Sequence, residues 1–431
     1  MKKKKLFAAI ACLALHLHAV CQQANHVVLI SIDGLRPDFY VDKSWPAPNL
    51  QKLKNEGAYA REVRSVFPSI TYPSHTTIVT GAYPARHGIY YNAPYGGKKR
   101  QWYWEETYIK VPTLWDAVRE AGLKSGAVMW PVTVGAPIDY NFPVRRAHEG
   151  ETGTQLEITK PLVTPAGLLD DMGPLTTADF NTSNTIDITI GKMGAHILKK
   201  YKPNLLALHF VTVDHAQHDH GRNHVEVKQT VALVDSMIGV VFNAIKEARI
   251  QENTTVIITG DHGFYDHNRT FSPNVLLAQH NLLDKANFYS AGGSAFLYVK
   301  NHDKTTINKI KSLLTALPEK MFRIIDRDEL DKCGANPEVA LALDMLPGYV
   351  ANNDAKGQLV NSKEPGGSHG YFPDTHDIAT GFIAVGKNIN KQEIKDMGVQ
   401  DVAPLIARLL QLNFKTPDGV LIPGIIKGEI K

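Results

Sequence analysis

The chain has 431 residues, of which 43% are hydrophobic and 21% are charged, enough for a large core or for one large domain with a smaller one. It carries 47 Lys and Arg residues against 43 Asp and Glu residues. Four of the lysines lie at the extreme N-terminus, so the rest of the chain is close to neutral. Its longest basic run there is Lys98-Lys99-Arg100. This balance argues against binding of polymeric nucleic acid.

The N-terminus has the pattern of a secretory signal peptide. Lys2 to Lys5 form a basic segment, and Leu6 to Val20 form an apolar stretch that is too short, with these flanks, to span a membrane. We expect residues 1–21 to be removed and the protein to be exported, either to the periplasm or out of the cell. A lipid anchor on Cys21 is the weaker alternative because His18-Ala19-Val20 is a poor lipobox. No other segment is expected to cross a bilayer. Cys333 is then the one cysteine certain to remain, so we expect no disulfide.

Strand and helix signals alternate along the rest of the chain. This alternation predicts an α/β fold with a doubly wound, mostly parallel central sheet and helices on both faces. Strands are expected at 26–33, 125–130, 204–213, 255–260, 293–300 and 378–386, and helices at 47–57, 76–80, 113–121, 186–201, 225–250 and 402–412. Residues 131–185 look like loops and an insertion near the mouth of a site. Residues 303–362 are expected to form a small subdomain inserted in one main domain that covers 22–431.

Three of the apolar runs are each followed by an acidic residue. These residues are Asp33, Asp214 and Asp261. Ligands of open α/β sheets bind outside the carboxyl ends of the strands, so we expect the three carboxylates to converge there. His262 follows Asp261 directly, and His218 stands four residues after Asp214, on the same face of a helical turn. Carboxylate and imidazole ligands suit zinc and similar transition metals, so the pattern predicts a metallohydrolase.

Each of these short motifs is weak when taken alone. A single Asp-x-x-x-His is usually a polar loop with surface histidines, and His215 and His220 remain alternative ligands by spacing. Asp and Gly are ordinary turn residues, so the DHG at 261–263 is equally weak by itself. It is the conjunction of three strand-terminal acids with two neighbouring histidines that favours a metal site.

A segment rich in hydroxyl groups, FPSITYPSHTTIVTG at residues 67–81, supplies candidate nucleophiles. Ser69, Thr71 and Ser74 are ordinary helix caps on the simplest interpretation. A hydroxyl at a helix N-terminus beside a divalent cation would instead have a lowered pKa and act as a nucleophile. The pattern does not choose among the three hydroxyls.

Several blocks of the sequence together resemble the nucleotide pyrophosphatase/phosphodiesterase family of the alkaline phosphatase superfamily. The resemblance covers roughly residues 26–421. It is carried, in the order of the family, by ISIDGLRPDF, FPSITYPSHTTIVTGAYPARHGIYYN, PTLWDAVREAGLKSGAVMWP, VDHAQHDHG, ITGDHGF and GGSHGY. It implies an alkaline phosphatase-like fold and two zinc ions per chain. The implied zinc ligands are Asp33, Asp261, His262 and the nucleophile Thr71 for one ion, and Asp214, His218 and His369 for the other.

The same resemblance implies roles for residues around the substrate. Asn92 matches an asparagine that contacts a phosphoryl oxygen, and Tyr72 matches an aromatic that packs on a nucleotide base. Tyr140 is expected to form the opposite wall of that slot. Ile70 and Ser74 depart from the Lys and Asn that the family often has there, which bears on substrate preference and not on the metal ligands.

The reaction we expect is attack of Thr71 on a phosphodiester or pyrophosphate of a small-molecule nucleotide. It passes through a covalent phosphothreonine and releases a nucleoside 5′-monophosphate. Asn92 and the Tyr72 N–H are expected to stabilise the phosphoryl oxygens. After the strand at 125–130 the chain offers Trp130 as an aromatic and no cation before Arg145, which favours diesters over dianionic monoesters. The alternatives are an alkaline phosphatase-like phosphomonoesterase, a phospholipase C-like choline phosphodiesterase, and a zinc-dependent protein that binds phosphate ligands without turnover.

Overall fold

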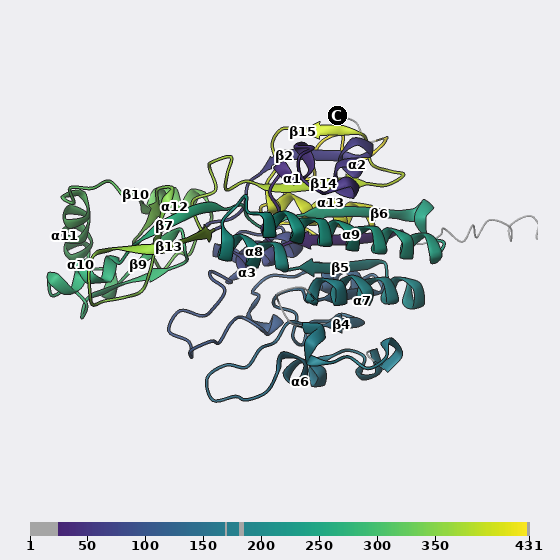
Figure 1. The fold of residues 1–431 in the computed structure, drawn as a ribbon, viewed down its shortest axis with the longest axis horizontal. Coiled ribbons are helices and arrows are strands. Elements are labelled where there is room, and N and C mark those ends of the chain that lie inside the picture. The colour runs from purple at the N-terminus through teal and green to yellow at the C-terminus, as the bar shows by residue number, and fades with distance from the viewer. Residues whose placement is uncertain (1–24, 169, 181–184, 429–431) are drawn as a thin grey trace, which may run out of the picture.

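A computed structural model describes residues 25–168, 170–180 and 185–428, so the expected signal peptide at residues 1–21 lies outside the described part of the chain. The main body is built on an eight-stranded sheet, and a smaller lobe lies beside it (Figure 1). In spatial order the strands are β15 (Gln392–Ile394), β2 (Ala58–Val63), β14 (Thr380–Val385), β6 (Thr254–Thr259), β1 (His26–Ile32), β5 (Leu205–Phe210), β3 (Ser125–Val128) and β4 (Tyr140–Phe142).

The central sheet is mostly parallel. Strands β6, β1, β5, β3 and β4 pair in parallel, and so do β2 and β15. Only β14 runs antiparallel to its neighbours β2 and β6. The expected α/β fold with a mostly parallel central sheet is therefore confirmed.

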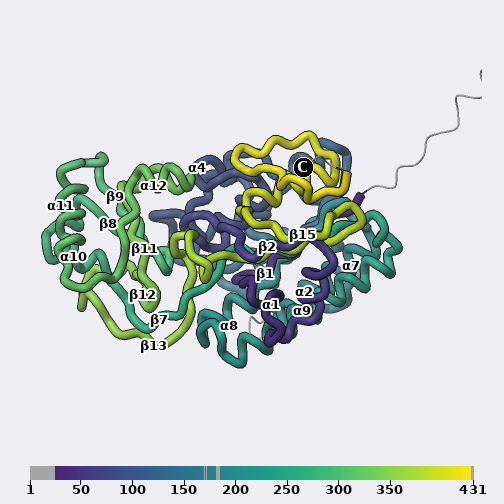
Figure 2. The backbone as a smooth tube through the Cα atoms, turned by 90° about the horizontal axis from the view of Figure 1, so that it is seen from above, coloured from purple at the N-terminus to yellow at the C-terminus, as the bar shows by residue number. Residues whose placement is uncertain are grey.

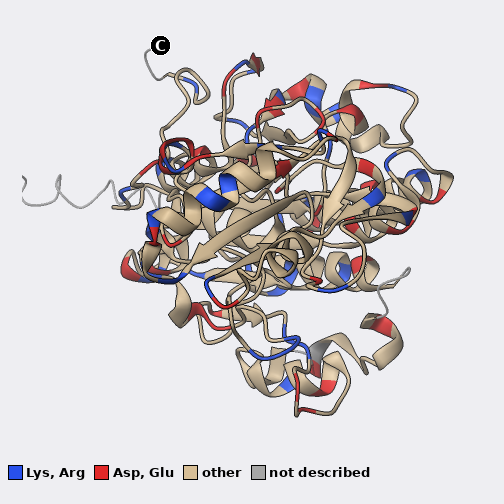
Figure 3. Cartoon of the chain, turned by 90° about the vertical axis from the view of Figure 1, so that its left-hand side faces the viewer, with Lys and Arg blue, Asp and Glu red and all other residues tan. Residues whose placement is uncertain are grey.

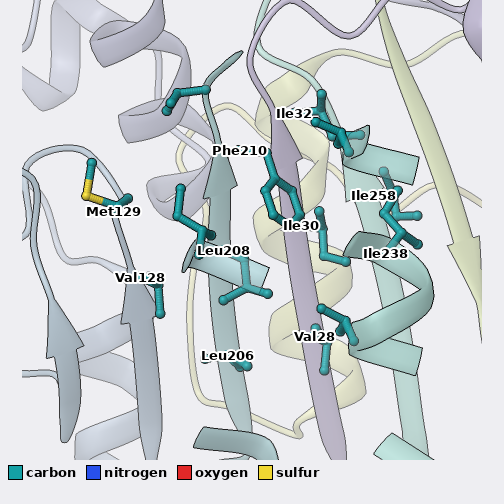
Figure 4. Close-up of a cluster of buried hydrophobic side chains, with 14 of the residues drawn as sticks. Val28, Ile30, Ile32, Val128, Met129, Leu206, Leu208, Phe210, Ile238 and Ile258 are labelled. Atoms are coloured by element: carbon teal, nitrogen blue, oxygen red, sulfur yellow. The ribbon is translucent and has the colours of Figure 1, made fainter. Parts of the chain in front are cut away.

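Alternate residues of the central strand β1 face opposite sides of the sheet, as the two-residue period of a strand requires. Val28, Ile30 and Ile32 join one buried core cluster, whereas Val27 and Leu29 join another. Figure 4 shows the first set packing beside Leu206, Leu208 and Phe210 of β5 and Ile238 of α9. The helices α2 (Pro48–Glu56), α7 (Ile186–Tyr201) and α9 (Val225–Glu247) cover this face, and α3 (Thr71–Thr80), α5 (Leu114–Glu120) and α13 (Val402–Leu409) cover the other.

The helices follow from their sequence patterns. In α9 the apolar residues recur every three or four positions and are buried, as an amphipathic helix requires: Val227, Val231, Val234, Ile238, Val241 and Ile245. Thr113 and Asp116 form a capping box at the start of α5. Helix α3 begins at Thr71 and not at the expected residue 76, because Pro73 is tolerated within the first turn of a helix.

The smaller lobe lies between β6 and β14 in the chain and holds two sheets, seen from above in Figure 2. One sheet has the order β10-β11-β9-β8 and is antiparallel, and the other has the order β12-β7-β13. The strands are β7 (Tyr265–Phe271), β8 (Ala286–Ser290), β9 (Ser294–Val299), β10 (Phe322–Ile325), β11 (Leu341–Met345), β12 (Gly348–Ala351) and β13 (Val360–Ser368), and the helices are α10 (Pro273–Gln279), α11 (Lys304–Thr315) and α12 (Arg327–Lys332). The lobe starts before residue 303, because β7 pairs with β12 and β13, and β9, which also pairs with β8, pairs with β11.

Connecting segments complete the fold. They contain α1 (Asp38–Val41), α4 (Pro84–His87), α6 (Gln155–Thr159) and α8 (Thr212–His220). No helix in the described part of the chain has the length and apolarity of a membrane span. Cys333 is half-buried and unpaired. Figure 3 shows basic and acidic residues interspersed over the molecule, in agreement with the near-neutral balance of the sequence.

Candidate metal centre and substrate cavity

Three of the expected ligands meet at the carboxyl ends of two adjacent parallel strands. Asp33 follows β1, and Asp261 and His262 follow β6. The Nε2 atom of His262 lies 3.3 Å from Oδ1 of Asp33 and 3.2 Å from Oδ2 of Asp261. All three residues are buried. The convergence expected from the strand ends therefore occurs.

The other three expected ligands form a group beside them. Strand β5 ends at Phe210, so Asp214 lies in the first turn of α8 and not at the end of the strand. Its Oδ1 atom is 3.3 Å from Nε2 of His218, one helical turn later, and 3.4 Å from Nε2 of His369. His369 arrives from the smaller lobe, because β13 pairs with β7 and ends at the site.

The two groups form one continuous cluster. The ligand atoms of Asp214, His218 and His369 lie within 4.8 Å of one another, and those of Asp33, Asp214 and His262 do so as well. His215 and His220, the alternatives that spacing left open, belong to neither group. The structure thus brings all six expected ligands together.

Backbone carbonyl groups orient the three imidazoles of this cluster. Nδ1 of His218 lies 2.9 Å from the Gly367 carbonyl oxygen, and Nδ1 of His369 lies 3.2 Å from that of Ser69. Nδ1 of His262 lies 3.3 Å from the carbonyl oxygen of Gly263. A carbonyl only accepts, so each Nδ1 carries a hydrogen, and in the neutral ring each Nε2 turns a lone pair toward the cluster, as ligand histidines do.

The carboxylates are oriented in the same manner. Oδ1 of Asp261 accepts hydrogen bonds from the backbone N–H groups of Gly34 and His262, and Oδ2 of Asp33 lies 3.1 Å from Nε2 of His209. The atoms left over are buried and have no hydrogen-bond partner in the described chain, namely Asp33 Oδ1, Asp214 Oδ1, Asp261 Oδ2 and His262 Nε2. Unpartnered buried polar atoms are costly, and here they converge. The donor set and its orientation fit divalent zinc or a similar transition metal.

The pKa values show the electrostatic strain of this cluster. Burial, followed by the negative charge of Asp33, raises the pKa of Asp261 to about 8. Burial also acts to raise the pKa of Asp33, but the hydrogen bond with His209 and the positive charges of His209 and His262 hold it well below its usual range. Burial acts to lower the pKa of His262, yet Asp261 and Asp33 raise it to about 9. The carboxylates thus need positive charge beside them, which protons or a divalent cation can supply.

The orienting role of His209 was not anticipated from the sequence. The residue lies within β5, is 4% exposed, and contacts Asp33 on one side and the Met129 carbonyl oxygen on the other. The available signal was a single polar residue in the otherwise apolar run LLALHF. A buried polar residue needs a partner, so that signal pointed to a hydrogen-bonded role.

Only one of the three candidate hydroxyl groups faces the substrate cavity. Thr71 is the first residue of α3 and lines a cavity of about 250 Å³ together with Asp33 and Asp214. Ser69 and Ser74 are fully buried. The hydroxyl of Ser69 donates to the Tyr371 carbonyl, and that of Ser74 pairs with Ser65. The structure therefore singles out Thr71 as the hydroxyl that can meet a substrate.

Asn92 lines the same cavity. Its Oδ1 atom accepts a hydrogen bond of 2.9 Å from the backbone N–H of Tyr72. The amide nitrogen of Asn92 takes no part in this bond and is available as a donor to a bound ligand. In this arrangement the Tyr72 N–H orients Asn92, whereas we had expected it to contact the substrate itself.

Aromatic residues form one end of the cavity. Tyr72 is 2% exposed and meets the ring of Trp102 edge to face, with the ring centroids 5.1 Å apart. Trp102 lines the cavity and stacks on Trp104 at 5.8 Å. Sequence reasoning missed Trp102, although the run WYW at 102–104 is an unusual density of aromatic residues.

Two aromatic residues that we expected near the substrate, Trp130 and Tyr140, do not line this cavity. Met129 lines the cavity, whereas Trp130 belongs to the core on the other face of the sheet, where it is fully buried against Trp115 and His75. Tyr140 opens β4 and stacks on Tyr201 with centroids 4.2 Å apart. The cavity lies beyond the carboxyl ends of the strands. Tyr140 is at the opposite, amino end of β4 and therefore does not reach the cavity.

A cation that was not anticipated lines the cavity. Arg145 forms a bidentate pair with Glu151 and lies over the ring of Trp104. The next residue, Arg146, lines the cavity, and its charge acts on the hydroxyl of Tyr72. Arg146 has no acidic partner among the residues that the structure describes. The absence of a nearby cation, which we had taken to favour diesters over monoesters, is therefore not what the cavity shows.

Comparison with known sequences places these features in a family. The family described as "Type I phosphodiesterase / nucleotide pyrophosphatase" matches residues 27–372. Ectonucleotide pyrophosphatase/phosphodiesterase family member 7 of Rattus norvegicus is 25% identical over 95% of this chain and 88% of its own length. Venom phosphodiesterase CdcPDE of Crotalus durissus collilineatus is 24% identical over 92% of this chain and 46% of its own length. Against Homo sapiens family member 1, which is 26% identical, the match spans 55% of this chain and only 23% of the human protein.

Solved structures share the fold. Human ectonucleotide pyrophosphatase/phosphodiesterase 5 superposes with a TM-score of 0.68 at 20% identity, over 93% of this chain and 100% of the other. The murine protein, solved as an inactive variant in complex with AMP, gives 0.67 at 21% identity, over 92% of this chain and 97% of the other. The chain therefore belongs to the type I phosphodiesterase/nucleotide pyrophosphatase family, as its motifs indicated.

Proposed function

We propose that the protein is a two-zinc phosphodiesterase and nucleotide pyrophosphatase that releases nucleoside 5′-monophosphates through a covalent phosphothreonine. The observation that carries this proposal is the position of Thr71. Its side chain lines a cavity shared with Asp33 and Asp214, whose unpartnered oxygens belong to the buried ligand cluster. Family membership supports the same class of reaction.

The residues that would hold the metal are those of the cluster. Asp33, Asp261 and His262 would hold one zinc ion, and Asp214, His218 and His369 the other. Bound there, the two ions would lower the pKa of the Thr71 hydroxyl and neutralise charge on the phosphoryl oxygens.

The chain itself supplies the nucleophile and the positioning groups. Oγ1 of Thr71 attacks phosphorus, the bond from phosphorus to the leaving group breaks, and a phosphothreonine ester forms. Hydrolysis by water then releases the nucleoside 5′-monophosphate and restores the hydroxyl. The amide of Asn92, oriented by the Tyr72 N–H, donates to a phosphoryl oxygen on which charge develops.

The aromatic end of the cavity supports a nucleotide as substrate. Trp102 and Tyr72 present aromatic surface beside Thr71, and bases stack on such surfaces with a contribution of about 1–3 kcal/mol each. Trp102 takes the place that we had expected for Tyr140. A choline headgroup is disfavoured because the positive charge of Arg146 lines the same cavity.

A phosphomonoesterase is the second candidate, and Arg146 is the observation that favours it. A dianionic monoester gains more from a nearby guanidinium group than a monoanionic diester does. The aromatic residues and the family relationship still favour the diester.

Hydrolysis rates on three nitrophenyl esters test the proposal. We expect the ester of thymidine 5′-monophosphate to react with the highest kcat/KM, ahead of nitrophenyl phosphate and nitrophenyl phosphocholine. The nucleotide proposal fails if the thymidine ester is the poorest of the three. A highest rate on nitrophenyl phosphate would establish the monoesterase instead.

A further inference from the structure

A second cluster of potential metal ligands lies on the surface, at the turn between α8 and α9. It consists of His220, the last residue of α8, His224, which precedes α9, and Glu226 in the first turn of α9. One ligand atom from each residue lies within 4.8 Å of the other two. Both histidines are exposed. None of the three belongs to the buried cluster.

The side chains of this surface cluster already face one another. The rings of His220 and His224 lie nearly parallel, at 14°, with centroids 5.1 Å apart. Nδ1 of His224 contacts Oε2 of Glu226, an oxygen that is shielded from solvent. Ligands of a tetrahedral zinc ion at about 2.1 Å from the metal lie about 3.4 Å apart. Small rotations of exposed side chains would therefore close the site.

The turn that carries the two histidines is held rigidly. Gly221 has φ of 81°, which permits the sharp turn after α8. The buried guanidinium group of Arg36 donates to the carbonyl of Arg222 and to Oδ1 of Asn223, each at 3.0 Å. The backbone N–H of Arg222 donates to Asp266 at 2.7 Å. Because the backbone is fixed, ligand binding would order only the side chains, which lowers its entropic cost.

One side of the cluster opens to a cavity of about 500 Å³. His220 and His224 line this cavity, so a metal held by the three residues would keep a position open to water or to a further ligand, as three-ligand zinc sites do. His267 lines the same cavity, is 6% exposed, and has an Nδ1 atom without a hydrogen-bond partner in the described chain. A bound water or ligand in the cavity would satisfy that atom.

We propose that His220, His224 and Glu226 form an additional zinc site, separate from the buried cluster, that clamps the end of α8 to the start of α9. Two imidazoles and one carboxylate are a ligand set that zinc commonly takes. The proposal does not rest on the proposed function, because its residues take no part in that chemistry.

Zinc titration of the metal-depleted protein tests this site. We expect the double variant His220→Ala/His224→Ala to bind one zinc equivalent fewer than the wild type, measured by competition with a chromophoric chelator and by native mass spectrometry. His376→Ala is the matched control, because His376 pairs with Glu62 at 2.8 Å as an exposed imidazole–carboxylate pair without a third ligand. The control should bind as many equivalents as the wild type.

A second variant keeps the test decisive if the double variant folds poorly. Glu226→Gln retains the shape of the side chain and should weaken zinc binding at this site by at least about tenfold. Loss of a residue that only hydrogen-bonds to a metal ligand already lowers metal affinity by about 10- to 100-fold. Asp214→Asn, in the buried cluster, should leave the affinity of the surface site unchanged. Equal zinc content and affinity in wild type, double variant and Glu226→Gln would overturn the proposal.

Discussion

The metal-ligand cluster and the aromatic end of the cavity lie side by side but are built differently. The ligands of the cluster follow strands β1 and β6, lie in α8, or arrive from β13, and backbone groups or His209 hold most of them in orientation. Apart from Tyr72 of α3, the aromatic end comes from the loop that carries Trp102 and from residues beyond β4, such as Val144 and Arg146. In the proposed function, regular elements carry the chemistry, whereas loops carry most of the contacts to the substrate. Substitutions in the two regions should therefore differ in size and in kind.

Loss of the proposed nucleophile, Thr71, should give the largest effect. Thr71→Ala should lower kcat for the thymidine ester by at least about a thousandfold, because Thr71 carries the only aliphatic hydroxyl among the described residues that line the cavity. Zinc content should not change, since the six other ligands remain. Ser74→Ala, which removes a neighbouring hydroxyl of α3 that is bonded to Ser65, should keep most of the activity. Undiminished turnover in Thr71→Ala would remove this residue from the mechanism.

Loss of the group that orients Asp33 should give the next largest effect. His209→Ala leaves Oδ2 of Asp33 without its partner and should weaken zinc binding by about 10- to 100-fold. His209→Gln can still donate a hydrogen bond and should recover part of that loss. Zinc affinities from chelator competition provide the measurement. Equal affinity in the wild type and both variants would show that Asp33 needs no such partner.

Metal removal should make stability depend on pH in a defined direction. The pKa of Asp261 is raised from 3.8 to about 8, and that of His262 from 6.5 to about 9. Both groups bind protons more tightly in the folded state, so the metal-free protein should lose stability as pH rises through these ranges. The depressed pKa of Asp33 affects stability only at acidic pH, below the range compared here. Thermal unfolding with a chelator should thus give a lower Tm at pH about 9 than at about 6, and bound zinc should reduce this difference. A Tm that rises with pH under chelation would contradict the electrostatics of the cluster.

The same division explains what the sequence could predict. Asp33, Asp261 and His262 lie just beyond the ends of buried strands, and parallel strands end at a common edge, so short motifs predicted that these three side chains converge. Asp214 and His218 followed from the spacing of a helical turn. His369 lies far from them in the chain, and only the family resemblance brought it to the site.

Residues set by tertiary packing escaped prediction. Trp130 and Tyr140 were chosen as aromatics near strand ends, but the turn after β3, where Met129 has φ of 58°, and the register of β4 direct them elsewhere. Trp102 and Arg146 lie on loops, whose course no periodic pattern encodes. We expected a smaller lobe that begins at residue 303, which is too short. The pairing of β7 with β12 and β13 joins residues far apart in the chain, and a local sequence pattern does not predict such pairing.

Loss of the aromatic wall should change binding more than chemistry. Trp102→Ala should raise KM for the thymidine ester by about tenfold, since one stacked base contributes about 1–3 kcal/mol, and kcat should change little. Tyr140→Ala is the control, because Tyr140 stacks on Tyr201 outside the cavity. A larger rise in KM for Tyr140→Ala than for Trp102→Ala would restore Tyr140 to the base-binding slot.

Arg146 should give the smallest effect, and its pattern separates the two candidate substrates. The guanidinium charge acts on the hydroxyl of Tyr72, which places it at the aromatic end, where it can donate to a carbonyl of a bound base. Loss of one such hydrogen bond costs about 1 kcal/mol. Arg146→Gln should therefore lower kcat/KM for the thymidine ester by about fivefold and leave nitrophenyl phosphate, which has no base, nearly unchanged. A greater loss on nitrophenyl phosphate would mean that Arg146 reaches the phosphoryl dianion, and the cavity would then have been built for monoesters.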